Sequence, residues 1–174
     1  MNYANDLIGA GATHFVPVIW PASSGADTAI NSDRVNVGKA NGVLFLVQLG
    51  AIDSGFSGTI VVYGADAATG GNSTALATLR YRIMKTVDTW TAEAVDANGA
   101  LTIVAGGDIV PVTDNNCMVA LRVLSTDIAA LGAGYKFAYV TISAGGSSKA
   151  VIASAVAGMI WPRYCAEPPV SVIA

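Results

Sequence analysis

The sequence predicts an all-β protein, and three observations support that fold class. Short segments rich in β-branched and aromatic residues alternate between apolar and polar positions. Glycine occurs 19 times and punctuates these segments along the whole chain. No stretch has the sustained 3.6-residue apolar period of a helix. About eight to ten short strands at this spacing predict one β-sandwich domain over residues 1–174, of the jelly-roll type.

The first half of the chain contains the most apolar of these segments. Residues 42–49 are apolar on both faces of a strand, so we expect both faces to be covered. A first strand at Thr13–Ile19 contains Pro17, which suits a sheet edge or a bulge. The other expected elements are a loop at Pro21–Asp27, a short strand at Arg34–Val37, a turn at Asp53–Gly58, a strand at Thr59–Tyr63 and a polar loop at Ala65–Thr74.

The second half alternates more regularly. In Leu79–Lys85, the side chains of Arg80 and Arg82 share one face, opposite Leu79, Tyr81 and Ile83. In Cys117–Leu124, the odd-numbered residues form the apolar face. The other expected elements are strands at Thr89–Val95, Leu101–Val104, Tyr135–Ile142 and Val151–Ile160, a turn at Asp96–Gly99, and one helical turn at Thr126–Leu131 capped by Ser125 or Thr126.

Both ends of the chain are expected to be extended arms. Residues 1–12 form the N-terminal arm, and residues 161–174 form a proline-rich C-terminal arm with Pro162, Pro168 and Pro169. The C-terminal arm is too apolar for a disordered tail, because disordered segments avoid such residues. It is therefore expected to lie on a protein surface, its own or a neighbour's.

The composition excludes several functions. Hydrophobic residues make up 53% of the chain and charged residues 12%, against about 25% charged in an ordinary soluble domain. Part of the surface is therefore expected to be buried against partners, in a homo-oligomer (trimer or dimer). The net charge of −3 and the lack of a basic run argue against nucleic acid as a partner. No apolar stretch reaches the length of about 20 residues that a membrane-spanning helix needs. The first 12 residues lack the basic start of a signal peptide, so we expect a protein that assembles in a cytoplasm.

Few residues offer chemistry, and the sequence predicts a protein that is not an enzyme and has no cofactor. The only histidine is His14, and a catalytic triad or a histidine metal site would have to use it. The acidic residues lie near turns, which aspartate favours, and form no evident catalytic pair. Cys117 and Cys165 are expected to be reduced thiols.

Five residues are candidates for a protein interface. Arg80 and Arg82 either form a contact face, where arginine is enriched, or lie on a solvated outer face. Trp161, Arg163 and Tyr164 lie at the start of the C-terminal arm, where Trp161 is the best apolar anchor. Trp90 is expected in the core.

The order of several segments resembles that of small structural proteins of tailed phages, the jelly-roll capsid decoration (cement) proteins. The segments are residues 42–50 (GVLFLVQLG), 61–66 (VVYGAD), 81–90 (YRIMKTVDTW), 124–131 (LSTDIAAL), 135–142 (YKFAYVTI) and 161–164 (WPRY). The resemblance implies an oligomer that binds the major capsid protein on the outside of a phage head, with arms that reach neighbours. Such a protein belongs to the virion and assembles in the host cytoplasm.

The residues leave two other functions open. One is another virion part on a β-sandwich, from the tail, baseplate or connector. The other is a carbohydrate-binding jelly roll, which requires exposed aromatic side chains.

Overall fold

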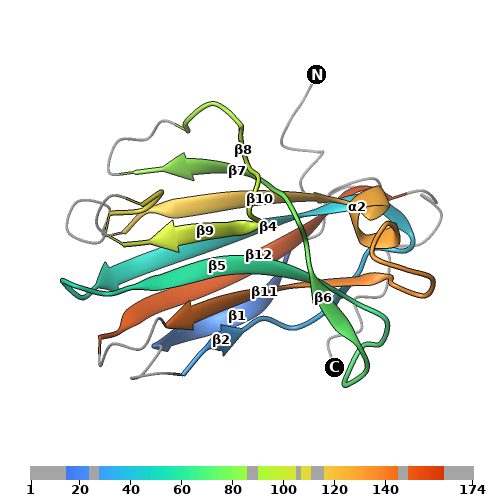
Figure 1. Ribbon diagram of the computed structural model, residues 1–174, viewed down its shortest axis with the longest axis horizontal. Helices are drawn as coiled ribbons and strands as arrows, with labels where there is room; N and C mark the ends of the chain where they lie inside the picture. Colours follow the sequence, from blue (N-terminus) through green and yellow to red (C-terminus); the bar gives the residue numbers. More distant parts are fainter. Residues whose placement is uncertain are drawn as a thin grey trace.

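The computed structural model describes residues 15–23, 28–85, 90–104, 107–110, 116–144 and 149–162. Within these residues, two antiparallel sheets pack against each other and one short helix, α2 (Ser125–Ala129), lies at one end of them (Figure 1). The predicted all-β sandwich is thereby confirmed.

The first sheet is called the β4 sheet, after one of its central strands. Its strand order is β1 (Phe15–Ser23), β12 (Val151–Pro162), β4 (Ala40–Ile52), β10 (Met118–Leu124), β7 (Leu79–Met84) and β8 (Ala94–Asp96). The second sheet, called the β5 sheet, has the order β2 (Ile30–Asn31), β11 (Phe137–Ala144), β5 (Gly58–Ala65) and β6 (Ser73–Ala75). β3 (Val35–Asn36) also pairs with β11, and β9 (Ala100–Ile103) pairs with β5.

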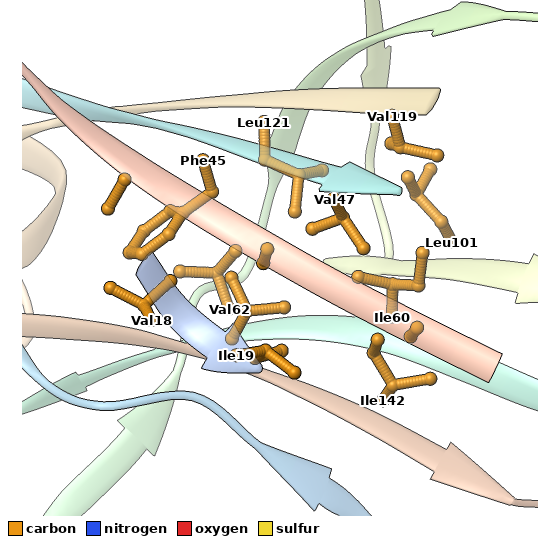
Figure 2. Close-up of a cluster of buried hydrophobic side chains, with 14 of the residues drawn as sticks. Val18, Ile19, Phe45, Val47, Ile60, Val62, Leu101, Val119, Leu121 and Ile142 are labelled. Atoms are coloured by element: carbon orange, nitrogen blue, oxygen red, sulfur yellow. The ribbon is translucent and has the colours of Figure 1, made fainter. Parts of the chain in front are cut away.

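The core lies between the sheets and is built from alternate residues of their strands. Figure 2 shows Phe45 and Leu121 of the β4 sheet directed toward Ile60 and Val62 of the β5 sheet. All four side chains are buried. The odd-numbered residues of β10 and the preceding Cys117 are buried as predicted: Cys117, Val119, Leu121 and Val123. This alternation fixes the face on which every other residue of these strands lies.

A polar contact also joins the two sheets. The hydroxyl of Tyr81 on β7 donates a hydrogen bond to Asp108 Oδ1 (3.2 Å), and Asp108 Oδ2 accepts bonds from the amide and hydroxyl of Thr102 on β9 (2.9 Å each). The pKa of Tyr81 is raised, first by burial and then by the Asp108 carboxylate, because both disfavour the phenolate.

The chain passes from the β4 sheet to the β5 sheet through the turn between β8 and β9. Asp96 Oδ1 accepts the amide of Asn98 (2.7 Å), and Gly99 has a φ of +69°. A Cβ at Gly99 would lie 2.0 Å from the carbonyl oxygen of Leu76, so this turn requires glycine for both conformation and space.

Several predicted boundaries are wrong. β1 continues to Ser23, although a loop was expected from Pro21, because β1 keeps pairing with β12 across two register shifts. Pro17 borders the first shift on this edge strand, as predicted. The Ala65–Thr74 loop is also shorter than expected, since β6 begins at Ser73.

Thr89 lies outside the described residues, and from Trp90 on the strand expected at Thr89–Val95 is largely replaced by irregular chain. Only Trp90 forms a bridge, to Met84, and β8 covers Ala94–Asp96. The Thr91 hydroxyl accepts the amide of Ile83 (2.9 Å), so a side chain satisfies a backbone group that a regular strand partner would otherwise bind.

Two corrections concern chain ends and caps. The C-terminal arm cannot begin at Trp161, because β12 extends to Pro162, which pairs with Ala40. The helix starts at Ser125 with Leu124 as its N-cap, and Asp127 Oδ2 accepts the Leu124 amide (3.1 Å). Neither Ser125 nor Thr126 is the N-cap, contrary to the prediction.

Candidate interaction surface

Arg80 and Arg82 lie on the outer face of the β4 sheet, as the alternation predicts. In the register of β7 with β10, Arg80 lies directly opposite Arg122, and Arg82 lies opposite Ala120. Like charges placed directly across two strands repel each other. The outer face therefore holds three arginines close together, and the sequence interpretation included only two of them.

Two ion pairs hold the opposed arginines. Arg80 Nη1 contacts Asp127 Oδ2 of α2 at 2.7 Å, and Arg122 Nη2 contacts Glu93 Oε1 at 2.5 Å. Exposed ion pairs of this kind contribute about 0–1 kcal/mol to stability. Their main consequence here is positional, because each guanidinium is held in one place.

The arginines surround an open depression on this face, with a volume of about 480 Å³. Leu44, Leu46 and Ala120 supply apolar surface from β4 and β10, and Trp90 and Glu93 approach from the chain that follows β7. The complete lining is Leu44, Leu46, Arg80, Tyr81, Arg82, Trp90, Glu93, Ala120 and Arg122. Trp90 is half-buried beside this depression and not in the core, contrary to the sequence interpretation.

Other parts of the outer face of the β4 sheet also expose apolar side chains. Among the described residues, the exposed large hydrophobic side chains are Phe15, Trp20, Val95 and Ile152, and all of them belong to strands of this sheet. Trp20 is 73% exposed and Val95 is 62% exposed. Leu44 and Leu46 are half-buried, so the outer face of β4 is covered only in part, where complete cover was expected.

The outer face of the β5 sheet has a different chemistry. Polar side chains pair across its strands. Thr59 Oγ1 lies 2.6 Å from Ser143 Oγ, and the Thr141 hydroxyl donates a hydrogen bond to Asn31 Oδ1 (2.8 Å). Tyr63 and Tyr139 stack with ring centres 5.2 Å apart. The guanidinium of Arg34 lies 5.0 Å from the Tyr139 ring centre. This face therefore presents polar groups and stacked phenol rings, whereas the outer face of the β4 sheet exposes large apolar side chains, both aromatic and aliphatic.

The structure brings together only part of the predicted interface. Arg80 and Arg82 line the depression. Trp161 belongs to β12, but the position of its side chain is not described, and Arg163 and Tyr164 lie outside the described residues. The sequence interpretation missed Arg122, although the alternation of β10 places its side chain on the outer face, away from the buried Leu121 and Val123.

Two of the acidic residues near turns, Asp53 and Asp66, hold their loops through carboxylate hydrogen bonds. Asp53 Oδ2 accepts the amide of Ala150 (2.9 Å), and Asp66 accepts the amide and side chain of Asn72 (2.9 and 3.0 Å). In the part of the chain that the structure describes, no three His, Cys, Asp or Glu residues come together as metal ligands. His14 lies outside that part.

Among the described elements, no helix has the length and apolarity needed to cross a lipid bilayer. Comparison of the chain with protein-family models, curated proteins and solved structures found no match.

Proposed function

We propose that this protein is a virion structural protein that decorates a phage capsid and binds the shell protein through the outer face of the β4 sheet. The observation that carries the proposal is that Phe15, Trp20, Val95 and Ile152, the exposed large apolar residues of the described chain, all lie in this one sheet. Phe15, Trp20 and Ile152 lie on the neighbouring strands β1 and β12, whereas Val95 lies on β8 at the opposite edge of the sheet. The half-buried Leu44 and Leu46 lie between them on β4. Exposed apolar side chains concentrated on one sheet are typical of a protein interaction surface.

The order of the strands supports a jelly roll as the fold of this proposed protein. Eight strands are numbered here in chain order: β1, β2, β4, β5, β9, β10, β11 and β12. The two sheets then contain the orders 1-8-3-6 and 2-7-4-5. Jelly rolls have eight strands in two Greek keys, and viral capsid proteins use this fold. β6, β7 and β8 form an insertion between the fourth and fifth strands, and β7 contributes Arg80 and Arg82.

The proposed role needs no catalytic residue. A decoration protein on the outer surface of a capsid acts by many repeated contacts, because multivalency converts modest affinities into firm attachment. The proposal includes self-association as a trimer or dimer and assembly in the host cytoplasm. Light scattering at micromolar concentration measures the mass of the isolated protein, and a monomeric mass would remove the oligomer from the proposal.

Shell binding is tested with empty shells assembled from the major capsid protein of the genome that encodes this chain. Co-sedimentation measures the affinity of the wild-type protein, of Leu46→Asp and of the matched control Val61→Asp. Leu46 and Val61 are both half-buried, on the outer faces of opposite sheets. We expect wild-type and Val61→Asp to bind and Leu46→Asp to lose binding. A wild-type protein that does not bind the shells would refute the proposed function.

A second candidate function, carbohydrate binding, is favoured by the outer face of the β5 sheet. Tyr63 and Tyr139, together with the guanidinium of Arg34, offer aromatic and hydrogen-bonding groups of the kind that small-ligand sites use. Titration with a panel of bacterial surface glycans tests it. Binding that is lost in Tyr139→Ala and retained in Leu46→Asp would support this candidate over shell decoration.

A further inference from the structure

The depression on the outer face of the β4 sheet carries a charge opposite to that of the whole protein. Its lining contains three arginines and one glutamate, and Asp127, which pairs with Arg80, adds a second carboxylate. These five groups sum to +1, whereas the complete chain has a net charge of −3. Three of the nine Lys and Arg residues of the chain line this one depression. A positively charged depression on an acidic protein favours a partner group that is negatively charged.

The three arginines differ in whether they have a carboxylate partner. Arg80 is paired with Asp127 and Arg122 with Glu93, and these pairs hold the two guanidinium groups opposite each other. Arg82 is exposed, and within the described residues no carboxylate pairs with it. Arg82 therefore presents hydrogen-bond donors to a partner, next to two cations that are already positioned.

The surroundings of these cations are apolar. Leu44, Leu46 and Ala120 lie on the neighbouring strands, and Trp90 lines the same depression. Arginine and tryptophan dominate the energetic centres of protein interfaces, because each combines a large contact area with hydrogen-bonding groups. A ligand that fits this depression needs a carboxylate for the arginines and an adjacent apolar side chain for Leu46 and Trp90.

We infer that this depression binds an acidic side chain from an otherwise apolar segment of the shell protein. The inference rests on the proposed function and names the partner group at the same face. The carboxylate accepts hydrogen bonds from Arg82, whose planar fork suits bidentate contact, and is attracted by the neighbouring Arg122.

The charge of the depression also argues against a second copy of this chain as the occupant. A two-fold contact centred on this face would place the same patch against itself. Each patch holds three arginines against the two carboxylates of Glu93 and Asp127, so two facing patches would both carry an excess of positive charge, which opposes association.

The experiment uses the full chain and the same shells as above. It compares the wild type with Arg82→Glu, Arg82→Gln and the matched control Lys149→Glu. Lys149 is exposed in the chain before β12, and its reversal changes the net charge as much as Arg82→Glu does. Circular dichroism and urea unfolding establish that each variant is folded. Because Arg82 is exposed on a strand surface, its replacement is expected to leave the fold intact.

We expect Arg82→Glu to weaken shell binding by about ten- to a hundredfold, the range for hydrogen bonds to charged groups, and Arg82→Gln by about tenfold. Lys149→Glu should change binding less than about threefold. Wild-type affinity should fall as salt rises from about 50 mM to about 500 mM, and Arg82→Gln should show a weaker dependence.

Four results would overturn the inference. If Arg82→Glu binds as tightly as the wild type, the inference is wrong while the proposed function stands. If Lys149→Glu loses as much affinity as Arg82→Glu, overall charge and not this depression governs binding. If Arg82→Glu instead changes the oligomeric mass measured by light scattering and leaves shell binding unchanged, the acidic group comes from another copy of the chain. Failure of the wild type to bind shells at all refutes the proposed function and this inference together.

Discussion

Replacing two neighbouring residues of β4 by alanine tests how the strand divides core from outer face. Phe45 is fully buried between the sheets, as Figure 2 shows, whereas Leu46 is half-buried on the outer face. Removing a buried phenylalanine side chain costs about 3–5 kcal/mol, because the transfer energy is lost and a cavity is left. Half of the burial energy of a leucine is about 1 kcal/mol. We therefore expect Phe45→Ala to lower the free energy of unfolding several times more than Leu46→Ala.

Urea unfolding followed by circular dichroism measures both changes. With a slope of about 2 kcal/mol per molar urea, Phe45→Ala should lower the midpoint by about 1.5–2.5 M and Leu46→Ala by about 0.5 M. Shell binding should respond in the opposite order, with Leu46→Ala weakened and any folded Phe45→Ala protein unaffected. Equal midpoint shifts for the two variants would refute the assignment of these residues to opposite faces.

Three further predictions concern the β8–β9 turn, the contact between the sheets and the C-terminal segment. Gly99→Ala should lower the melting temperature by at least about 3 °C, and more than Gly55→Ala, because Gly55 shares a positive φ but has open space around its Cβ position. Because the pKa of Tyr81 is raised in the folded protein, this tyrosine loses its proton at a lower pH in the unfolded chain, so the free energy of unfolding should fall as the pH rises above about 10. The fall should be smaller in Tyr81→Phe. An equal fall in both proteins from about pH 8 to about pH 11.5, measured by urea unfolding, would contradict this prediction. Deleting residues 165–174 should preserve the β-type circular dichroism spectrum and weaken oligomerisation or shell binding, whereas loss of folding would assign that segment to the core.

Strand existence and strand faces were predictable because alternation is a local property. The buried set at Cys117, Val119, Leu121 and Val123 and the shared face of Arg80 and Arg82 both follow from a two-residue period. No local pattern shows which strands become neighbours. Arg80 lies opposite Arg122 only because β7 pairs with β10, and these two arginines are 42 positions apart in the sequence (122 minus 80).

The errors in the predicted boundaries have the same origin. Pro21 predicts the start of a loop. In the structure β1 continues beyond Pro21, because β12 supplies a partner strand and two register shifts accommodate the irregular backbone. The large apolar side chain of Trp90 predicts a core position. In the structure, two hydrogen bonds between Thr91 and Ile83 end the regular strand pairing, and Trp90 lines the depression instead. Contacts with segments distant in the sequence determine where such strands end and where such side chains lie, and a single sequence does not show which segments become neighbours.

The contrast between the two outer faces accounts for the unusual composition of the chain. A sandwich with two solvated faces normally places charged residues on both. Here the β5 sheet is solvated mainly through hydroxyl and phenol groups, as Thr59, Thr141 and Tyr139 show, so it needs few charges. The β4 sheet exposes large apolar residues and has three arginines in one depression. Only 12% of the residues need be charged if one face is polar without charge and the other is covered by a partner. The repulsion between Arg80 and Arg122 fits the same scheme, because a partner carboxylate that enters the depression would relieve it on binding.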